Sequence, residues 1–405
     1  MDIIEKLKKY NQEQLLEFEK DLNETEKLEL HTQIQEIDFT YLEELNKTKN
    51  QTKDKITPIK AITVDEIAKQ EAQFKEIGLK ALKNQKVAAL LLAGGMGTRL
   101  GSDNPKGMYN IGKTKDVYIF QRIVENLLDV VNICKKPVPL FIMTSEKNND
   151  TTIKFFQEHN YFGYNPEYVK FFVQEMAPCC DLSGKVLLEE KHRVATSPNG
   201  NGGWFNSLLR NTEAKKMLED YKIEWINVFA VDNVLQKIAD PVFIGATLGG
   251  NYEIGAKVIR KVDPYEKVGV MCNKNGKPSI VEYMDITEEM AHEKDENGER
   301  VYNFGVILNY LFNVDLLYEI KDKKLPIHVV TKKVEYINDF GEKIKPETPN
   351  AHKFEMLCVD MIEFANTCLP YEVVREKEFA PIKNKTGVDS VESAQALLEQ
   401  NDYKL

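Results

Sequence analysis

The chain has 405 residues, and 54 lysines and arginines stand against 64 aspartates and glutamates, which gives a net charge of -10. Hydrophobic residues make up 42% of the chain and charged residues 29%, a globular composition that excludes wholesale disorder. The acidic balance argues against nucleic acid as a main partner, and no apolar run approaches the roughly 18 residues of a membrane span, which excludes a membrane protein.

The first 55 residues predict a helical region that packs on a larger domain, because apolar residues recur there at near-helical spacing. Asp38 is the expected N-cap of a further short helix. A coiled-coil arm is the alternative, but no heptad repeat is sustained. Residues 46–60 are polar and predict a linker, so the first region is expected at 1–60.

The N-terminus has no apolar core like that of a secretory signal, so a cytosolic protein is expected. Six cysteines are too few for a disulfide scaffold in a chain of this length, which predicts reduced thiols. Cys179 and Cys180 are adjacent, and the sequence does not decide whether they respond to redox state.

The pattern changes at residue 86, where a continuous apolar run ends directly in glycines. Such a run is typical of a strand buried on both faces of a parallel sheet. The strand–helix alternation that follows predicts an α/β fold with a doubly wound, mostly parallel central sheet, whose ligands bind at the carboxyl ends of the strands. Further apolar runs begin at Val138, Val169 and Trp225, with amphipathic helical stretches at 117–134 and 151–159.

From about residue 255 the pattern becomes typical of antiparallel strands. Apolar segments begin at 255 and 268, and a third, at 278–283, follows a polar turn as in a hairpin. Residues 388–400 predict one amphipathic helix. A catalytic domain is therefore expected at 61–380, with a short C-terminal segment at 381–405.

The glycine-rich segment 92–101 (LAGGMGTRLG) directly follows the first buried strand. Glycines let the backbone approach a ligand closely and point N–H groups at an anion. Arg99 and Lys106 add positive charge, so a polyphosphate is the expected ligand. The segment is not a dinucleotide fingerprint, because Leu100 replaces the third glycine, and it is not a P-loop, because Thr-Arg follows Gly97.

The motif G-G-x-G-T-R-L-G, followed by P-K-G-M at 105–108, resembles the uridylyltransferases that make UDP-sugars, above all the eukaryotic UDP-N-acetylglucosamine pyrophosphorylase family. The resemblance runs from about residue 86 to the end. It implies a nucleotidyltransferase fold that joins UTP and N-acetylglucosamine 1-phosphate, with Mg²⁺ as cofactor, by in-line attack on the α-phosphorus. Similar motifs follow in the family's order, among them PNGNGG at 198–203, VDN at 231–233 and APIKN at 380–384.

The resemblance assigns catalytic roles through these motifs. Arg99 would grip the departing phosphates, and Lys106 would neutralise charge on the α-phosphate. Lys383 would reach the nucleotide or sugar phosphates, with a solvated surface lysine as the alternative. Asp232, at the end of an apolar strand, would hold Mg²⁺ together with phosphate oxygens and water, with a helix N-cap as the alternative.

The same resemblance implies a nucleotide site. Backbone groups of Ala93, Gly94 and Gly95 would face the uracil. Gln174 would read the uracil edge, since a side-chain amide donates and accepts at once. Gly200 would lie in the loop that closes over base and ribose.

A sugar site is implied by Asn201, Gly255, Glu282 and Tyr283. Glu282 would accept hydrogen bonds from sugar hydroxyls, and Gly255 would leave room for an N-acetyl group.

The chain departs from the family at two positions of the sugar block. Val306 replaces an asparagine and Tyr310 replaces a histidine, so glucose 1-phosphate or N-acetylgalactosamine 1-phosphate is an alternative substrate. A UDP-sugar-binding protein without catalysis is a second alternative, and a NAD-dependent oxidoreductase is the weakest. Family members usually continue into a small C-terminal β domain, whereas this chain ends at Leu405, so a monomer is expected.

Overall fold

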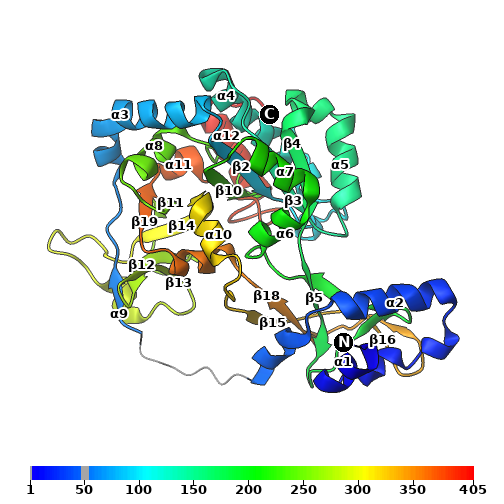
Figure 1. Cartoon of the computed structure of the whole chain (residues 1–405). Helices are drawn as coiled ribbons and strands as arrows, with labels where there is room; N and C mark the ends of the chain where they lie inside the picture. Colours follow the sequence, from blue (N-terminus) through cyan, green and yellow to red (C-terminus); the bar gives the residue numbers. More distant parts are fainter. Residues whose placement is uncertain (1, 47–53) are drawn as a thin grey trace. The chain divides into compact units, whose positions relative to one another are not determined.

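The computed structural model describes residues 2–46 and 54–405, which form two compact units (Figure 1). Unit 1 comprises 1–52, 174–204 and 324–358, and unit 2 comprises 53–173, 205–323 and 359–405.

This division differs from the contiguous domains expected at 1–60, 61–380 and 381–405. The N-terminal helices share unit 1 with two later segments, and the expected boundaries at residues 60 and 380 both fall within unit 2. Pairing between distant segments therefore sets the organisation of the chain.

Four strands of unit 2 pair in parallel, in the order β10, β2, β3, β4. Every residue of β2 and of β3 is buried, as a sheet covered on both faces requires. The predicted α/β class and its four apolar strands are thus confirmed. Their bounds are β2 (Val87–Leu92), β3 (Leu140–Thr144), β4 (Val169–Val173) and β10 (Trp225–Ala230).

The sheet continues beyond β10 with mostly antiparallel pairing, as expected from about residue 255. A hairpin joins β12 and β13 through Asn275 and Gly276, which have φ values of +53° and +84°, the left-handed pair that a tight hairpin turn needs. The strands are β11 (Ile254–Arg260), β12 (Val270–Lys274), β13 (Lys277–Val281), β14 (Phe304–Asn313) and β19 (Cys368–Glu372), and β19 pairs in parallel with β11.

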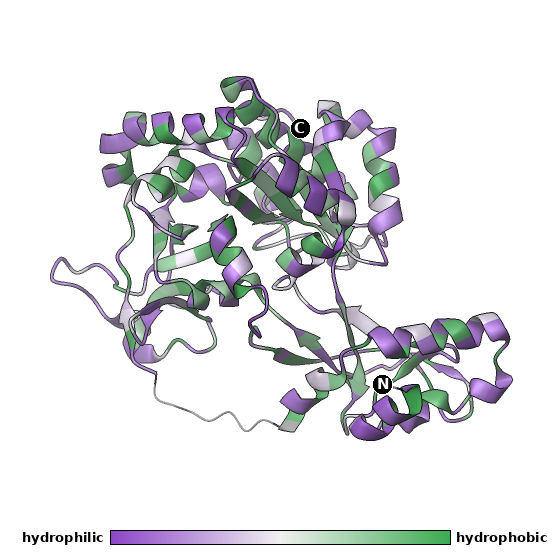
Figure 2. Ribbon diagram, viewed as in Figure 1, coloured by the Kyte–Doolittle hydropathy of each residue, from purple (hydrophilic) through white to green (hydrophobic). Residues whose placement is uncertain are grey.

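In unit 2, α3 (Val64–Lys83) alternates hydrophilic and hydrophobic residues along its ribbon (Figure 2), and Ile67, Phe74 and Leu82 are among its buried residues. The sequence prediction left out this helix, whose first turn is closed by a capping box between Thr63 and Glu66. The other helices are α4 (Ile119–Cys134), α5 (Asn149–Glu158), α6 (Trp204–Arg210), α7 (Thr212–Asp220), α8 (Pro241–Gly249), α9 (Glu288–His292), α10 (Val314–Ile320), α11 (Arg375–Glu378) and α12 (Val391–Gln400).

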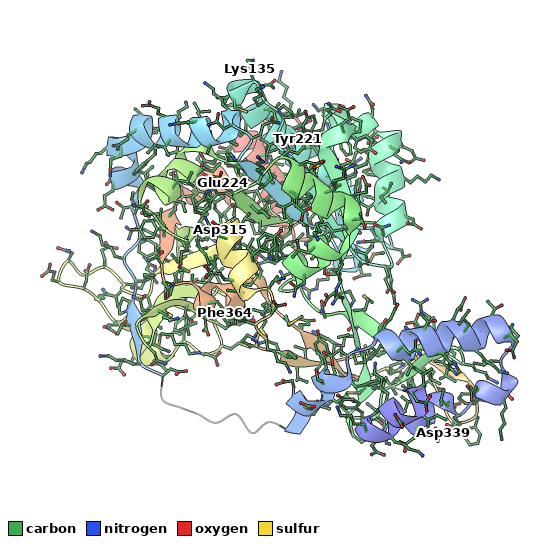
Figure 3. The ribbon with its side chains drawn as sticks, in the orientation of Figure 1. Lys135, Tyr221, Glu224, Asp315, Asp339 and Phe364 are labelled. Atoms are coloured by element: carbon green, nitrogen blue, oxygen red, sulfur yellow. The ribbon has the colours of Figure 1, made fainter. Side chains whose placement is uncertain are left out.

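The junction between β14 and α10 lies beside the start of β10. Figure 3 labels Glu224, just before β10, and Asp315, in the first turn of α10. The Val314 amide donates to the Glu224 carbonyl at 2.8 Å, and the Asn313 side chain caps α10. This contact fixes the antiparallel part of the sheet against its parallel part.

Unit 1 packs the predicted N-terminal helices α1 (Ile3–Tyr10) and α2 (Glu24–Glu36) against short strands. The Lys6 ammonium donates to three carbonyl groups at the end of α2, the usual way a lysine satisfies a helix C-terminus. The strands are β5 (Met176–Pro178), β6 (Cys180–Asp181), β7 (Leu188–Glu190), β8 (Arg193–Val194), β9 (Thr196–Pro198), β15 (His328–Lys332), β16 (Tyr336–Ile337), β17 (Lys343–Ile344) and β18 (Ala351–Glu355).

The linker predicted at 46–60 is only partly open to comparison, because residues 47–53 lie outside the described residues. Within the described part, the prediction is wrong at β1 (Ile56–Pro58), which pairs with β12 at the edge of the sheet in unit 2. None of the helices within residues 2–46 and 54–405 is both long and apolar enough to cross a membrane.

Candidate functional site

The glycine-rich loop leaves the carboxyl end of β2 and folds back on itself. The Ala93 amide donates to the Met143 carbonyl at 2.8 Å, and the Ala93 carbonyl accepts from the Asn148 side chain at 3.0 Å. The Lys106 amide donates to the Gly95 carbonyl at 3.1 Å, which closes the loop. Gly95 is exposed and a side chain there would meet only open space, so this part of the loop is accessible to a ligand.

Lys106 and Asp232 meet where β2 and β10 end. The Lys106 ammonium lies 3.8 Å from the Asp232 carboxylate, and their side chains are only 17% and 24% exposed. Burial lowers the pKa of Lys106, the Asp232 charge opposes this, and the charges of Lys383 and Arg99 lower the pKa further. The structure therefore brings together the four residues predicted to be catalytic or metal-binding.

The segment that carries Lys383 is joined to the end of β10 by hydrogen bonds. The Ile382 amide donates to the Asp232 carbonyl at 2.9 Å. The buried Asn233 side chain donates to the Glu378 carbonyl at 2.7 Å and accepts from the Ala380 amide at 2.9 Å. Asn233 was not among the predicted site residues, although it is the third residue of the VDN motif, which was the signal for it.

The predicted sugar contacts of unit 2 lie on and after β13. Glu282 follows β13, and Tyr283 beside it is 42% exposed. The Glu282 Oε1 and Val306 Cγ2 atoms both lie within 3.6 Å of the position that a Cβ on Gly269 would occupy. The apolar Val306 side chain is thus a neighbour of the predicted sugar-binding carboxylate.

Two other positions of the predicted sugar block are packed into the core. A Cβ on Gly255 would lie 2.4 Å from Thr247 Oγ1 and 2.7 Å from the Phe243 ring, both on α8. The space that a Cβ on Gly255 would occupy is therefore filled by α8, and the sugar contact of Gly255 stays a prediction. Tyr310 is fully buried on β14, so the histidine-to-tyrosine change falls in the core.

The remaining predicted contacts belong to unit 1. Gln174 is 7% exposed and is the first residue of its segment in this unit. Gly200 has a φ of +85°, and a Cβ there would lie 2.2 Å from the Met356 carbonyl, so glycine is required. The Asn201 side chain accepts from the Cys358 amide at 2.8 Å, which holds the loop to the end of β18. The nucleotide and sugar roles of these residues stay predictions.

Asp232 carries the carboxylate oxygens that are predicted to hold a metal ion. Within the described residues, no group of three or more His, Cys, Asp or Glu side chains could hold a metal ion by itself. Mg²⁺ is commonly held by one or two carboxylates, with substrate phosphates and water completing its ligands. The partly exposed Asp232 carboxylate beside the glycine-rich loop fits that kind of site.

The six cysteines all lie in the described part of the chain, and each is a buried thiol outside any disulfide. Burial raises the pKa of the Cys180 thiol to about 12, so it stays protonated and unreactive near neutral pH. Reduced thiols are therefore the state that the fold favours.

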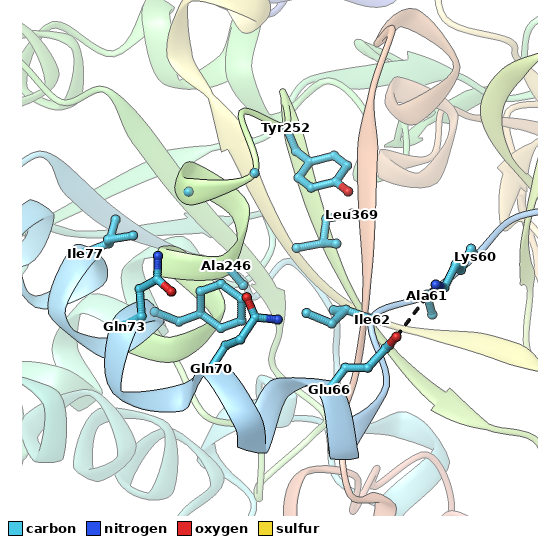
Figure 4. A pocket seen from close by; sticks show the side chains of 13 residues that line it. Lys60, Ala61, Ile62, Glu66, Gln70, Gln73, Ile77, Ala246, Tyr252 and Leu369 are labelled. Carbon is cyan, nitrogen blue, oxygen red and sulfur yellow. Dashed lines mark ion pairs between the residues drawn. The ribbon is translucent and has the colours of Figure 1, made fainter.

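A separate cavity of about 450 Å³ lies between α3 and α8 (Figure 4). An ion pair of 3.7 Å between Lys60 and Glu66 stands at its edge, and Gln70, Gln73 and Tyr252 line it. Its lining includes none of the predicted site residues.

The family model described as UTP–glucose-1-phosphate uridylyltransferase matches residues 32–404. The chain is similar to the UDP-N-acetylhexosamine pyrophosphorylase-like protein 1 of Mus musculus, with 40% identity over 329 residues, which cover 78% of this chain and 64% of the mouse protein. It is 38% identical over 359 residues to the UDP-N-acetylglucosamine pyrophosphorylase of Saccharomyces cerevisiae, covering 84% of this chain and 74% of the yeast protein.

Among solved structures, the uridine diphosphate N-acetylglucosamine pyrophosphorylase of Trypanosoma brucei, in complex with an inhibitor, is similar with a TM-score of 0.84. The identity is 28%, and the match covers 98% of this chain and 84% of the other. The chain spans about two thirds of the length of the first curated relatives it matches.

Proposed function

Because the chain belongs to the UTP–glucose-1-phosphate uridylyltransferase family, we propose that it transfers a uridylyl group from UTP to a sugar 1-phosphate. One observation carries this proposal: at the ends of β2 and β10 the Lys106 ammonium lies 3.8 Å from the Asp232 carboxylate, and the charges of Lys383 and Arg99 act on that same ammonium. Fixed positive charge beside an accessible glycine loop is the environment in which a polyphosphate binds and its transferred group is stabilised.

The reaction needs no covalent enzyme intermediate. A phosphate oxygen of the sugar phosphate attacks the α-phosphorus of UTP, the bond from that phosphorus to the bridging oxygen breaks, and pyrophosphate leaves with the electron pair. The attacking oxygen is ionised near neutral pH, because the second pKa of a phosphate monoester is about 6, so no general base is required. Catalysis then rests on positioning and on charge stabilisation.

The residues divide this work between them. Lys106 would neutralise the charge that builds on the α-phosphate, and its partial burial strengthens that interaction because less water screens it. Arg99 would hold the leaving pyrophosphate through its planar fork of donors. Lys383 would hold a further phosphate; its neighbour Ile382 is bonded to the Asp232 carbonyl.

Asp232 would hold Mg²⁺, and the metal would supply neutralisation of phosphate charge there. The support for this part is the donor set: a carboxylate at a strand end, 24% exposed, next to the proposed phosphate site. In the protein alone, Lys106 pairs with the same carboxylate at 3.8 Å and so limits its repulsion of the incoming anion.

N-acetylglucosamine 1-phosphate is the proposed sugar substrate. The names of the yeast and trypanosome relatives support it. Glucose 1-phosphate and N-acetylgalactosamine 1-phosphate are the alternatives, because Val306 lies beside Glu282 and offers no hydrogen bond. A sugar hydroxyl or amide left unpaired there would cost about 1–3 kcal/mol. We place the reaction in the cytosol, which the buried thiols outside any disulfide support.

The test is pyrophosphate release from the purified full chain with UTP and Mg²⁺, against a panel of sugar 1-phosphates. We expect N-acetylglucosamine 1-phosphate to have the highest kcat/KM.

The variant Val306→Asn should raise kcat/KM for that sugar relative to glucose 1-phosphate, and Val329→Asn, an exposed valine of unit 1, is its control. A preference for glucose 1-phosphate would support the proposed uridylyl transfer but contradict N-acetylglucosamine 1-phosphate as the sugar substrate. UTP binding without pyrophosphate release from any sugar phosphate would contradict the proposed activity.

A further inference from the structure

Lys383 is paired with a carboxylate that neither the sequence motifs nor the proposed reaction uses. Its ammonium lies 3.0 Å from Asp389 Oδ2, six residues further along the chain. The two side chains are 38% and 27% exposed, so a dissolved anion can reach the pair.

The backbone fixes where the Asp389 carboxylate stands. Asp389 has a φ of +51°, a left-handed conformation that few residues other than glycine adopt but that aspartate and asparagine tolerate. Its carbonyl accepts from the Lys383 amide at 2.6 Å and from the Asn384 amide at 3.0 Å. The Asn384 side chain donates to the Val388 carbonyl at 3.1 Å, which closes the loop. The ion pair is therefore built into a turn and is not a chance meeting of two long side chains.

The Lys383–Asp389 ion pair is weak enough for Lys383 to exchange Asp389 for a phosphate oxygen. Solvent-exposed ion pairs contribute little to stability, and a lysine that exchanges its carboxylate partner for a phosphate oxygen keeps a charge-assisted hydrogen bond. The ammonium can leave Asp389 for a phosphate oxygen without disturbing the turn, since backbone hydrogen bonds hold the turn.

We propose that Asp389 is a positioning residue, which holds the Lys383 ammonium toward the phosphate site and exchanges it with a phosphate of the substrate or of pyrophosphate. The inference rests on the proposed function and deepens it at the Lys383 position. Asp389 also adds a negative charge beside Lys383, whose own positive charge acts on Lys106, the partner of Asp232.

The two consequences of removing the Asp389 charge have opposite signs. Anions should bind more tightly, because the net positive charge of the site rises. Turnover should fall, because the Lys383 ammonium loses the partner that holds it in one place. A variant that merely damages the fold would weaken binding and turnover together, so this split distinguishes positioning from a structural role.

The first experiment is calorimetric titration of the full chain with pyrophosphate and Mg²⁺, comparing wild type with Asp389→Asn. Asparagine has nearly the same side-chain shape as aspartate without its charge, and it tolerates the left-handed backbone conformation of residue 389. We expect pyrophosphate to bind about two- to fivefold more tightly to the variant at low salt, with the difference shrinking at about 1 M salt. Unchanged or weaker binding would overturn the inference.

Steady-state kinetics supply the second readout. In Asp389→Asn we expect a lower KM for UTP and a kcat lower by about three- to tenfold. The kcat effect should disappear in a Lys383→Met background, where there is no ammonium to hold. An equal kcat loss in that background would mean that Asp389 acts through the fold, and the inference would fail.

Asp402→Asn is the matched control, because Asp402 is an exposed aspartate with a φ of +62° in the same C-terminal part of the chain. It should change neither pyrophosphate binding nor kcat. If wild type releases no pyrophosphate with any sugar phosphate, the proposed function fails, while the comparison of pyrophosphate binding still decides the role of Asp389.

Discussion

Two of the lysine–carboxylate clusters in unit 2, those around Lys257 and Lys106, differ in their access to water. The Lys257 ammonium is fully buried, 2.5 Å from Glu378 and 3.1 Å from Asp240. The Lys106 side chain is 17% exposed and lies 3.8 Å from a single carboxylate, Asp232. Identical functional groups thus form a closed network in one place and an open site in the other.

The electrostatics of the two lysines differ accordingly. Burial opposes the charge of Lys257, but Glu378 and Asp240 outweigh it, so the pKa of Lys257 is raised. Burial lowers the pKa of Lys106, and one carboxylate facing two further cations does not restore it. Lys257, whose charge is balanced by two carboxylates, stabilises the fold, whereas Lys106, whose charge is not fully balanced, suits the binding of an anion.

The two clusters are linked along the chain. Glu378 ends α11, and five residues later the same segment delivers Lys383 to the site. The buried network therefore anchors the segment whose far end takes part in the proposed reaction.

The largest effect on stability is expected from Lys257→Met, which leaves two buried carboxylates without their cation. Breaking a buried pair in this way costs about 3–5 kcal/mol of unfolding free energy. Lys237→Met is the control, because Lys237 is 62% exposed and lies 3.8 Å from the same Glu378; its loss should cost about 1 kcal/mol or less. Urea unfolding measures both, and equal losses would remove the distinction between the clusters.

Lys106→Met should have the opposite profile. We expect kcat/KM for UTP to fall by about 10²–10³, the usual cost of removing one preorganised group that stabilises transition-state charge. Stability should be unchanged or slightly higher, because the lowered pKa means that the fold disfavours the ammonium. Pyrophosphate release and urea unfolding test the two halves, and a large loss of stability with normal activity would contradict the assignment.

A smaller effect is expected where the two clusters are joined. Asn233→Ala removes the side chain that bonds to Glu378 and Ala380, so it should cost about 1–3 kcal/mol and also lower kcat, because Lys383 is carried on that segment.

The control for that variant is Asn227→Ala. Asn227 is equally buried on β10, but its side chain bonds to Asn309, the Tyr310 carbonyl and the Ala239 amide, all outside the Lys383 segment. It should lose similar stability in urea unfolding while kcat per folded molecule stays near wild type. A kcat loss of the same size in both variants would show that the effect is general destabilisation.

The parallel strands were predictable because each is a continuous apolar run and the first ends in glycines. The strands of unit 1 were not predicted, since β6 and β8 span only two residues and carry no periodic pattern. Their stability comes from pairing with segments far away in the sequence, such as β18 with β6. Local pattern therefore predicts the main sheet of unit 2 and the N-terminal helices of unit 1, but not the strands of unit 1.

The site follows the same division. Arg99, Lys106, Asp232 and Lys383 could be named because each stands in a motif whose chemistry needs its charge. Asp389 carried no such signal, since its partners are one side chain and two amides that only the folded turn brings together. Gly255 was recognised, but its packing against α8 is visible only once the helix is in place.

The smallest effect concerns pH. Lys106 must be charged to act on phosphate, and its pKa lies below the ordinary value, so activity should fall on the alkaline side earlier than for an ordinary lysine. Lys383 is one cause of that lowering. In Lys383→Met the pKa of Lys106 should rise, and the alkaline limb of kcat/KM, normalised to each variant's own maximum, should move to higher pH. Lys404→Met, which removes an exposed lysine of the same unit, should leave the limb in place. A limb that moves to lower pH in Lys383→Met would mean that the two ammonium groups do not share one site.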